Sequence, residues 1–171
     1  MINEKIQKAF NAQINAETFS AYLYLSMAAY FEELNLPGFG NWMKVQAQEE
    51  MVHAMKFYTF IIDRGGRVLL DALKKPETAW DSPLAAFQAG YAHEQYITNR
   101  INKLVDLAIE ASDHASKTFL DWFVTEQVEE EANSDNIGKQ LKLIEGSPQA
   151  LFLLDRELAA RVFTPPAAPA Q

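Results

Sequence analysis

The chain has 171 residues, of which 49% are hydrophobic and 22% charged, and it contains no cysteine. This length fits a single domain with a sizeable core, and the lack of cysteine excludes disulfides, iron–sulfur clusters and thiolate metal sites. The net charge of −8 argues against nucleic-acid binding, which needs clustered Lys and Arg, and no apolar run reaches the roughly 18 residues of a membrane span.

Helical periodicity predicts two long helices in the first part of the chain. The first covers residues 4–33, before a turn sequence at 35–38, and the second covers about 39–64, before the glycine pair 65–66. The apolar stripes consist of Ile6, Phe10, Ile14, Tyr24, Met27 and Phe31 in the first helix and Trp42, Val45, Phe57 and Phe60 in the second. The N-terminus lacks the residue order of a signal peptide, so we expect a cytoplasmic protein.

Two further long helices follow a linker. Residues 67–82 have no convincing helical period, and Ser82-Pro83 is typical of an N-cap and a first helical residue. The third helix therefore runs from 83 to about 111, and the fourth runs from about 115 to 145. Their apolar stripes consist of Phe87, Tyr91, Ile97, Ile101, Leu104 and Ala108, and of Phe119, Phe123, Ile137, Leu141 and Ile144.

A fifth, shorter helix is expected from 148 to about 162, after Gly146-Ser147. Its apolar face, which consists of Leu151, Leu154 and Leu158, needs a partner, either a neighbouring subunit or the chain's own bundle. We expect one helical domain over 1–162 and a flexible Pro/Ala-rich tail over 163–171.

The linker length predicts the order of the helices in space. Short loops make helices one and two antiparallel, and likewise three and four. At about 3.3 Å per extended residue, residues 67–82 could reach about 50 Å, whereas the second helix is about 39 Å long. The linker can therefore cross the whole bundle and leave helices two and three parallel. The predicted fold is all-α, a four-helix bundle with a long crossover between helices two and three and a short C-terminal fifth helix.

Each long helix carries a glutamate near the middle of its apolar stripe, at Glu17, Glu50, Glu94 and Glu130. Glu50-x-x-His53 also places an imidazole one turn from a carboxylate, on the same helix face. The four glutamates lie at depths that match to within about one turn at 1.5 Å per residue, so they can converge. No Lys or Arg stands within four residues of any of them. Two divalent cations, such as Fe(II), Mn(II) or Zn(II), would relieve their mutual repulsion.

Each of these signals has a simpler explanation when it is taken alone. A single Glu-x-x-His occurs by chance in many helices, and the run Glu129-Glu130-Glu131 is typical of a solvated helix face. His93 and His114 read as surface residues rather than ligands. A structural bundle with fortuitous acids is the non-enzymatic alternative. The coincidence on four helices favours the metal site.

With these residues assembled, the chain resembles a prokaryotic non-haem ferritin over residues 4–162. The resemblance is most specific in Glu17, Tyr24, Gln48-Glu49-Glu50-Met51-Val52-His53, His93-Glu94-Gln95 and Trp122 through Glu126-Gln127-Val128-Glu129-Glu130-Glu131. It implies a ferroxidase that oxidises Fe(II) with O₂ or H₂O₂ at a di-iron site. It also implies mineralisation of ferric oxide inside a hollow octahedral shell of 24 identical subunits, an expectation of iron storage and detoxification.

The resemblance implies the ligands of two iron ions. The first ion would be held by Glu17, Glu50 and His53. The second would be held by Glu50, Glu94 and Glu130, so that Glu50 bridges the pair. Four helices would then contribute to one intra-subunit site, as in ferritin-like di-iron carboxylate bundles.

The resemblance also implies roles for residues around the pair. Gln127 would lie beside the two ions, within reach of the oxygen ligand, and Tyr24 would be an electron donor or hydrogen-bond partner. A third, weaker iron site would be formed by Glu49, Glu126, Glu129 and Glu130.

Departures from related patterns leave alternatives open. Gln127-x-x-Glu130 stands where bacterioferritins keep Glu-x-x-His, which favours the non-haem branch. Met51 follows the bridging glutamate, where a bacterioferritin has its haem ligand; we interpret it as a packing residue, and haem binding stays an alternative. A non-storage di-iron peroxidase or oxidase is another, although the Cys-x-x-Cys domain of rubrerythrins is missing. A DNA-shielding mini-ferritin is disfavoured, because its metal site lies between subunits.

Overall fold

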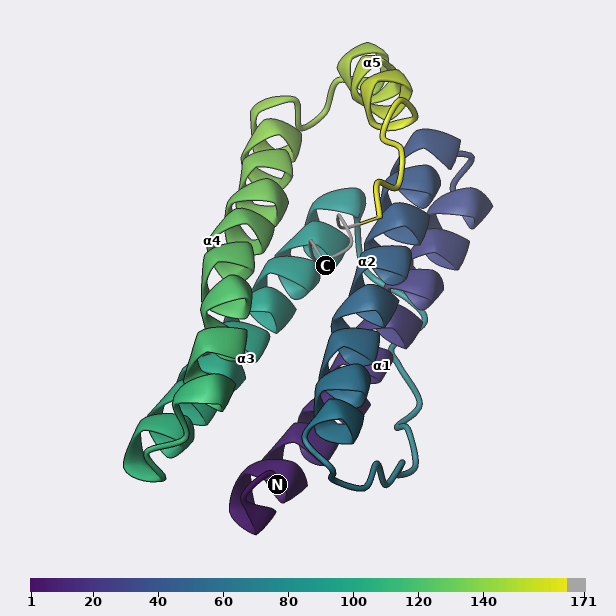
Figure 1. The fold of residues 1–171 in the computed structure, drawn as a ribbon. Helices are drawn as coiled ribbons and strands as arrows, with labels where there is room; N and C mark the ends of the chain where they lie inside the picture. Colours follow the sequence, from purple (N-terminus) through teal and green to yellow (C-terminus); the bar gives the residue numbers. More distant parts are fainter. Residues whose placement is uncertain (166–171) are drawn as a thin grey trace.

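Five helices make up most of the computed structural model, which describes residues 1–165. They are α1 (Glu4–Glu33), α2 (Pro37–Asp63), α3 (Pro83–Glu110), α4 (His114–Leu143) and α5 (Pro148–Leu158). The four long helices form a bundle, and α5 lies at one end of it (Figure 1). Within the described residues, no helix is both long and apolar enough for a membrane crossing. The predicted all-α fold is confirmed, whereas most of the predicted tail falls on 166–171, outside the described residues.

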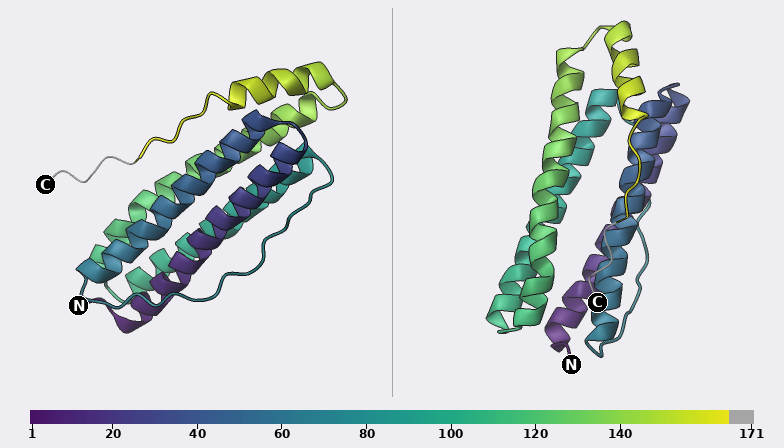
Figure 2. Two further views of the ribbon diagram at one scale, coloured as in Figure 1. Left: turned by 90° about the vertical axis from the view of Figure 1, so that its right-hand side faces the viewer. Right: turned by 45° about the horizontal axis from the view of Figure 1, so that its top comes forward.

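The segment between α2 and α3, residues 64–82, runs along the outside of α1 (Figure 2). Near its start, Asn11 of α1 donates from Nδ2 to the carbonyl of Arg67 (3.0 Å). Near its end, the ring of Trp80 packs edge-on against Tyr30 at 5.3 Å. The segment thus returns the chain to the end of the bundle where α2 began. Helices α2 and α3 are therefore parallel, as the crossover prediction required.

The hydrophobic core has two parts, one in each half of the bundle. In the half nearest α5, Phe31 stacks on Phe39 at a centroid separation of 5.1 Å. In the other half, Phe57 packs against Phe123 at 4.4 Å. The mid-height positions of the four long helices lie between these clusters. Polar residues there are surrounded by apolar packing on both sides, which keeps water away from them.

Helix α5 packs its apolar face onto the chain's own bundle. Leu154 and Leu158 are buried, and the backbone N–H of Phe39 donates to Oδ1 of Asp155 (3.0 Å). The helices approach so closely that a Cβ at Gly38 would lie 1.6 Å from the carbonyl oxygen of Asp155. Of the two partners left open for this face, the one observed is the chain's own bundle.

The predicted end of the fifth helix was wrong, because α5 stops at Leu158 rather than near Val162. The side chain of Asn41 on α2 explains the early end. Its Nδ2 atom donates to the carbonyl of Arg161 at 2.9 Å and lies 3.4 Å from the carbonyl of Leu158. These carbonyls therefore need no further turn of helix to be satisfied.

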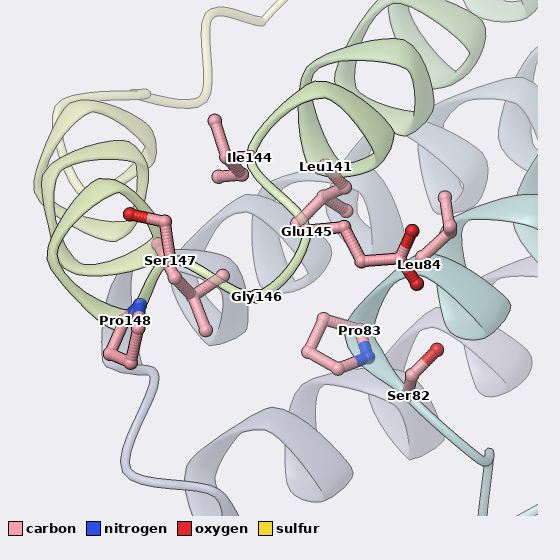
Figure 3. Close-up of a pocket in the computed structure, with 10 residues that line it drawn as sticks. Ser82, Pro83, Leu84, Leu141, Ile144, Glu145, Gly146, Ser147 and Pro148 are labelled. Atoms are coloured by element: carbon pink, nitrogen blue, oxygen red, sulfur yellow. The ribbon is translucent and has the colours of Figure 1, made fainter.

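The outer face of α5 and its junction with α4 expose apolar surface in the single subunit. Phe152 is 59% exposed and Leu153 is 67% exposed. A pocket of about 280 Å³ lies where α4 ends, α5 begins and the start of α3 comes near (Figure 3). Its apolar lining includes Pro83, Leu141 and Ile144. Apolar surface at this end is available for contacts with another chain.

Candidate metal centre

The predicted glutamates and His53 meet between the two core clusters, at mid-height of the bundle. Helix α1 supplies Glu17, α2 supplies Glu50 and His53, α3 supplies Glu94 and α4 supplies Glu130; each is at most 4% exposed. Helical spacing places Glu50 and His53 one turn apart on the buried face of α2. The other three come from separate helices, so the bundle itself assembles the group.

Three of these residues have the geometry of a cation site. One ligand atom from each of Glu17, Glu50 and His53 lies within 4.8 Å of the others. Oxygen Oε2 of Glu17 and Oε2 of Glu50 are buried and have no hydrogen-bond partner. A buried carboxylate oxygen without a donor costs about 1–3 kcal/mol or more. A cation bound between these atoms would remove that cost, and carboxylate oxygens with one imidazole suit Fe(II), Mn(II) or Zn(II).

A second group of possible ligands differs from the predicted one. One ligand atom from each of His53, Glu126 and Glu130 lies within 4.8 Å of the others. The resemblance had implied Glu50, Glu94 and Glu130 for the second ion. Oxygen Oε1 of Glu94 instead accepts a hydrogen bond from the Tyr24 hydroxyl.

The electrostatics of the centre favour protons or cations on its carboxylates. Burial, and then the charge of a neighbouring carboxylate, raises the pKa of Glu17, Glu94 and Glu130 from the ordinary value of 4.5 to about 8. Burial and Glu130 raise the pKa of Glu50 well above its ordinary value. Among residues 1–165, no lysine or arginine forms an ion pair with these four groups. A metal ion that binds here must displace protons at neutral pH.

Two buried glutamines, which the sequence analysis missed, each hold one carboxylate oxygen. Gln13 donates from Nε2 to Oε1 of Glu17 (2.7 Å), and Gln46 donates from Nε2 to Oε2 of Glu130. Both glutamines are fully buried. The sequence did contain a signal, because each stands four residues before a stripe glutamate, Glu17 or Glu50, on the same helix face.

Glu94 is held by the two residues that the resemblance had placed near the ion pair. Besides the Tyr24 hydroxyl, Gln127 donates from Nε2 to Oε2 of Glu94 (3.2 Å). Burial, and then the charge of Glu94, raises the pKa of Tyr24 well above its ordinary value, so the phenol keeps its proton. Both oxygens of Glu94 therefore have donors, whereas Oε2 of Glu17 and Oε2 of Glu50 have none.

The residues expected at a third site lie on the edge of the centre, on α2 and α4. Oxygen Oε1 of Glu126 lies 3.9 Å from Nε2 of His53. Glu49 is paired with Arg161, and Glu129 is exposed. A pocket of about 410 Å³, lined in part by Glu49, His53 and Glu126, opens here to the surface. Glu49 and Glu126 thus lie beside His53 around one pocket, whereas the exposed Glu129 does not line it.

One interpretation of a single residue needs correction. His93 was expected at the surface, but it is only partly exposed, with Nε2 2.7 Å from the hydroxyl of Ser20. Burial lowers its pKa to about 4, so the imidazole is neutral at neutral pH. The error arises because the face that a neighbouring helix covers depends on packing and not on the periodicity of one helix. Met51 is 42% exposed on α2 in the single subunit, so its role as a packing residue stays a prediction.

Comparisons with known proteins identify a protein family that matches most of the chain. The family model described as the ferritin-like domain matches residues 7–144. A bacterial non-heme ferritin from Bacteroides fragilis is 42% identical over 161 residues, covering 94% of this chain and all of that protein. A bacterial non-heme ferritin from Staphylococcus saprophyticus is 40% identical over 163 residues, covering 95% of this chain and 98% of that protein.

Solved structures are similar over nearly the whole chain. The open pore ferritin from the archaeon Archaeoglobus fulgidus is 53% identical, with a TM-score of 0.94 over 95% of this chain and all of that one. A closed form of that ferritin, engineered by site-directed mutagenesis, is 54% identical, with a TM-score of 0.95 over 96% of this chain and all of that one. The similarity therefore extends from the fold to the sequence.

Proposed function

The chain belongs to the non-haem ferritins, proteins that store iron and oxidise Fe(II), and we propose that Glu17, Glu50, His53, Glu94 and Glu130 form its ferroxidase centre. Family membership removes the alternative of a structural bundle with fortuitous acids. One observation carries the assignment of the centre. Two buried carboxylate oxygens, on Glu17 and Glu50, have no hydrogen-bond donor, and both residues offer a ligand atom within 4.8 Å of one from His53.

In this proposal the first Fe(II) is bound by Glu17, Glu50 and His53. The second is bound by Glu50, Glu94 and Glu130, with Glu50 as the bridging ligand. The proximity of Glu126 and Glu130 to His53 supports an additional position for iron on the same side. Gln127 and Tyr24 stay outside the ligand set and orient Glu94 through their hydrogen bonds.

The chemistry follows from the charge of the centre. Fe(II) displaces the protons of the carboxylates, and the resulting anions stabilise Fe(III) more than Fe(II), because the added positive charge gains more from nearby negative charge. Each Fe(II) loses one electron, so a pair supplies the two electrons that reduce O₂, with two protons, to H₂O₂. With H₂O₂ as the oxidant, two electrons and two protons yield two molecules of water. The protons displaced on binding are available for either reduction.

Iron that has been oxidised must leave the centre, and Glu49, Glu126 and Glu129, with Glu130, form the proposed third site. The pocket beside His53 supports this third site, because Glu49 and Glu126 line it. Partly exposed carboxylates bind iron more weakly than the buried set, which suits transfer. This route would lead from the centre to the mineral.

Ferritins assemble into oligomeric shells, and we propose that this chain forms a 24-subunit octahedral shell that encloses the ferric oxide mineral. The exposed apolar side chains of Phe152 and Leu153 on α5 support contacts between subunits. Gel filtration with light scattering tests the subunit number, because a 24-subunit shell elutes far ahead of a dimer. Electron microscopy after iron loading in air tests for electron-dense cores.

The centre itself is tested by replacing its bridging ligand. Glu50→Ala should abolish rapid Fe(II) oxidation, followed by stopped-flow absorbance, and leave the helical circular dichroism unchanged. Glu33→Ala, which removes an exposed carboxylate at the end of α1, is the matched control and should oxidise Fe(II) normally. Wild-type oxidation kinetics in the Glu50→Ala protein would disprove the assignment.

A further inference from the structure

Two arginines outside the centre each contact one of the buried glutamines that hold its carboxylates. Arg161, in the segment after α5, donates from Nη1 to Oε1 of Gln46 (2.9 Å). Gln46 then donates from its Nε2 atom to Glu130. These two hydrogen bonds form a relay, in which an arginine contacts a glutamine and the glutamine contacts a carboxylate. The relay connects the C-terminal segment to Glu130 of α4 through Gln46 of α2.

The second relay has the same order of groups on the opposite side of the centre. Arg100 of α3 donates from Nε to Oε1 of Gln13 (2.8 Å). Gln13 donates from Nε2 to Oε1 of Glu17 (2.7 Å). The two relays start from different elements and end at different carboxylates, so they are two independent occurrences of one arrangement.

We propose that Arg161 and Arg100 are positioning residues that fix the orientation of Gln46 and Gln13. This role rests on the ferroxidase centre proposed above. An amide group has an oxygen and an NH₂ group of similar shape, and a flip would turn the oxygen towards the carboxylate. A guanidinium has only donors, so it can face only the amide oxygen. The NH₂ group is thereby directed at the ligand carboxylate, and one carboxylate oxygen is held while the other stays available to iron.

The guanidinium of Arg161 is itself held in place. It lies over the ring of Trp42, 4.4 Å from the centroid, and donates to the Trp42 carbonyl (3.3 Å). Asn41 donates to the backbone carbonyl of Arg161 (2.9 Å), which anchors the segment after α5 on α2. A planar guanidinium can satisfy these partners and Gln46 together, whereas the single ammonium of a lysine cannot match that geometry.

Arg161 also pairs with Glu49, so its removal changes a charge near the centre as well as the amide. A test must separate these two effects. A double-mutant cycle with Gln46 does so, because an effect transmitted through Gln46 disappears once Gln46 is gone, while an effect through Glu49 persists.

The test uses Co(II), which reports ligation by its visible absorption and is not oxidised under these conditions. The assembled, metal-free protein is titrated with Co(II) as wild type, Arg161→Met, Gln46→Met and the double variant. Loss of an outer residue that orients a ligand costs about 10–100-fold in metal affinity or activity. We expect Arg161→Met to weaken Co(II) binding by about tenfold. The double variant should be no weaker than Gln46→Met alone.

The second relay is tested in the same way with Arg100→Met and Gln13→Met. Arg156→Met is the matched control, since Arg156 is exposed on α5, and it should bind Co(II) like wild type. If Arg161→Met does not assemble, Arg161→Lys replaces it in the cycle, with a smaller loss expected.

Wild-type Co(II) affinity in Arg161→Met, or losses that add fully with those of Gln46→Met, would overturn the positioning role. The outcome for the centre is separate. If Glu50→Ala loses rapid oxidation while Arg161→Met binds Co(II) normally, only the inference about the arginine fails. If Glu50→Ala oxidises Fe(II) normally, the proposed centre fails first.

Discussion

The Nδ1 atom of His53 lies 3.4 Å from Oε2 of Glu50, and that oxygen has no hydrogen-bond donor. Two ligands that are each about 2.0–2.1 Å from one metal ion are about 3–3.4 Å apart. The separation thus fits two ligands of one ion better than a hydrogen-bonded pair. Glu17 also offers a ligand atom within 4.8 Å of one from each of Glu50 and His53, which completes this group of three.

Replacing His53 with Ala should slow Fe(II) oxidation by about 100-fold, because even outer residues of metal sites cost about 10–100-fold when lost. Stopped-flow absorbance measures the initial rate at saturating Fe(II). His114→Ala is the control, since His114 is exposed at the start of α4 and has no place in the centre. Equal losses in both variants would show that the rate does not depend on ligation by His53.

Replacing Tyr24 with Phe should leave the fold unchanged, because the ring stays and only the hydroxyl is lost. Without this donor Glu94 is held by Gln127 alone, so we expect the oxidation rate to fall by about tenfold. Tyr22→Phe, at a tyrosine that is 49% exposed on the same helix, is the control. If both variants oxidise Fe(II) at the wild-type rate, the hydroxyl does not position Glu94.

The metal-free protein should become less stable as pH rises from about 5 to 8. Burial, and then neighbouring carboxylates, raises the pKa of Glu17, Glu94 and Glu130 from 4.5 to about 8. Between these values the folded state binds more protons than the unfolded state, so the free energy of unfolding falls as pH rises. The three glutamates contribute their full stabilisation below pH 4.5, which is their pKa in the unfolded state. They lose it as the pH rises through about 8, which is their pKa in the folded state.

The thermal midpoint in the presence of a chelator measures this dependence. Glu50→Gln should make the thermal midpoint less dependent on pH, because the substitution removes a charge that raises the pKa of Glu17 and Glu94. Saturating Zn(II) should reduce this pH dependence further, since the metal replaces the protons. A midpoint of the metal-free protein that rises over this interval would contradict the linkage.

Two helical glycines should respond in opposite ways to replacement by Ala. A Cβ at Gly38 would lie 1.6 Å from the carbonyl oxygen of Asp155, so Gly38→Ala must displace α5 and should cost about 3 kcal/mol or more. A Cβ at Gly138 meets nothing within 4 Å, so Gly138→Ala should stabilise α4 by up to about 1 kcal/mol. Thermal unfolding of both variants compares them directly. A Gly38→Ala protein as stable as wild type would show that α5 can shift without cost.

Local spacing in the sequence was sufficient to predict the four long helices and the glutamates of their buried stripes. Helical periodicity depends on residues three and four apart, and Ser82-Pro83 has the local chemistry of a helix start. The linker length alone predicted that α2 and α3 are parallel. These features involve neighbours along one helix or simple lengths of chain, which a sequence contains directly.

The partners of those glutamates depended on contacts between distant segments. Gln46 and Glu130 are 84 residues apart, and Arg161 and Gln46 are 115 apart. No spacing rule relates such residues, because their contact depends on how the helices cross and on the rotamers that packing allows.

Helical spacing is enough to predict which side chains could bind iron, because it puts them on the buried faces of four helices. Other features follow from the packing of the helices: α1 packs against His93, α5 docks on α2, and Arg161 contacts Gln46. A side chain's solvent exposure and hydrogen-bond partners are properties of the packed bundle, not of any one helix.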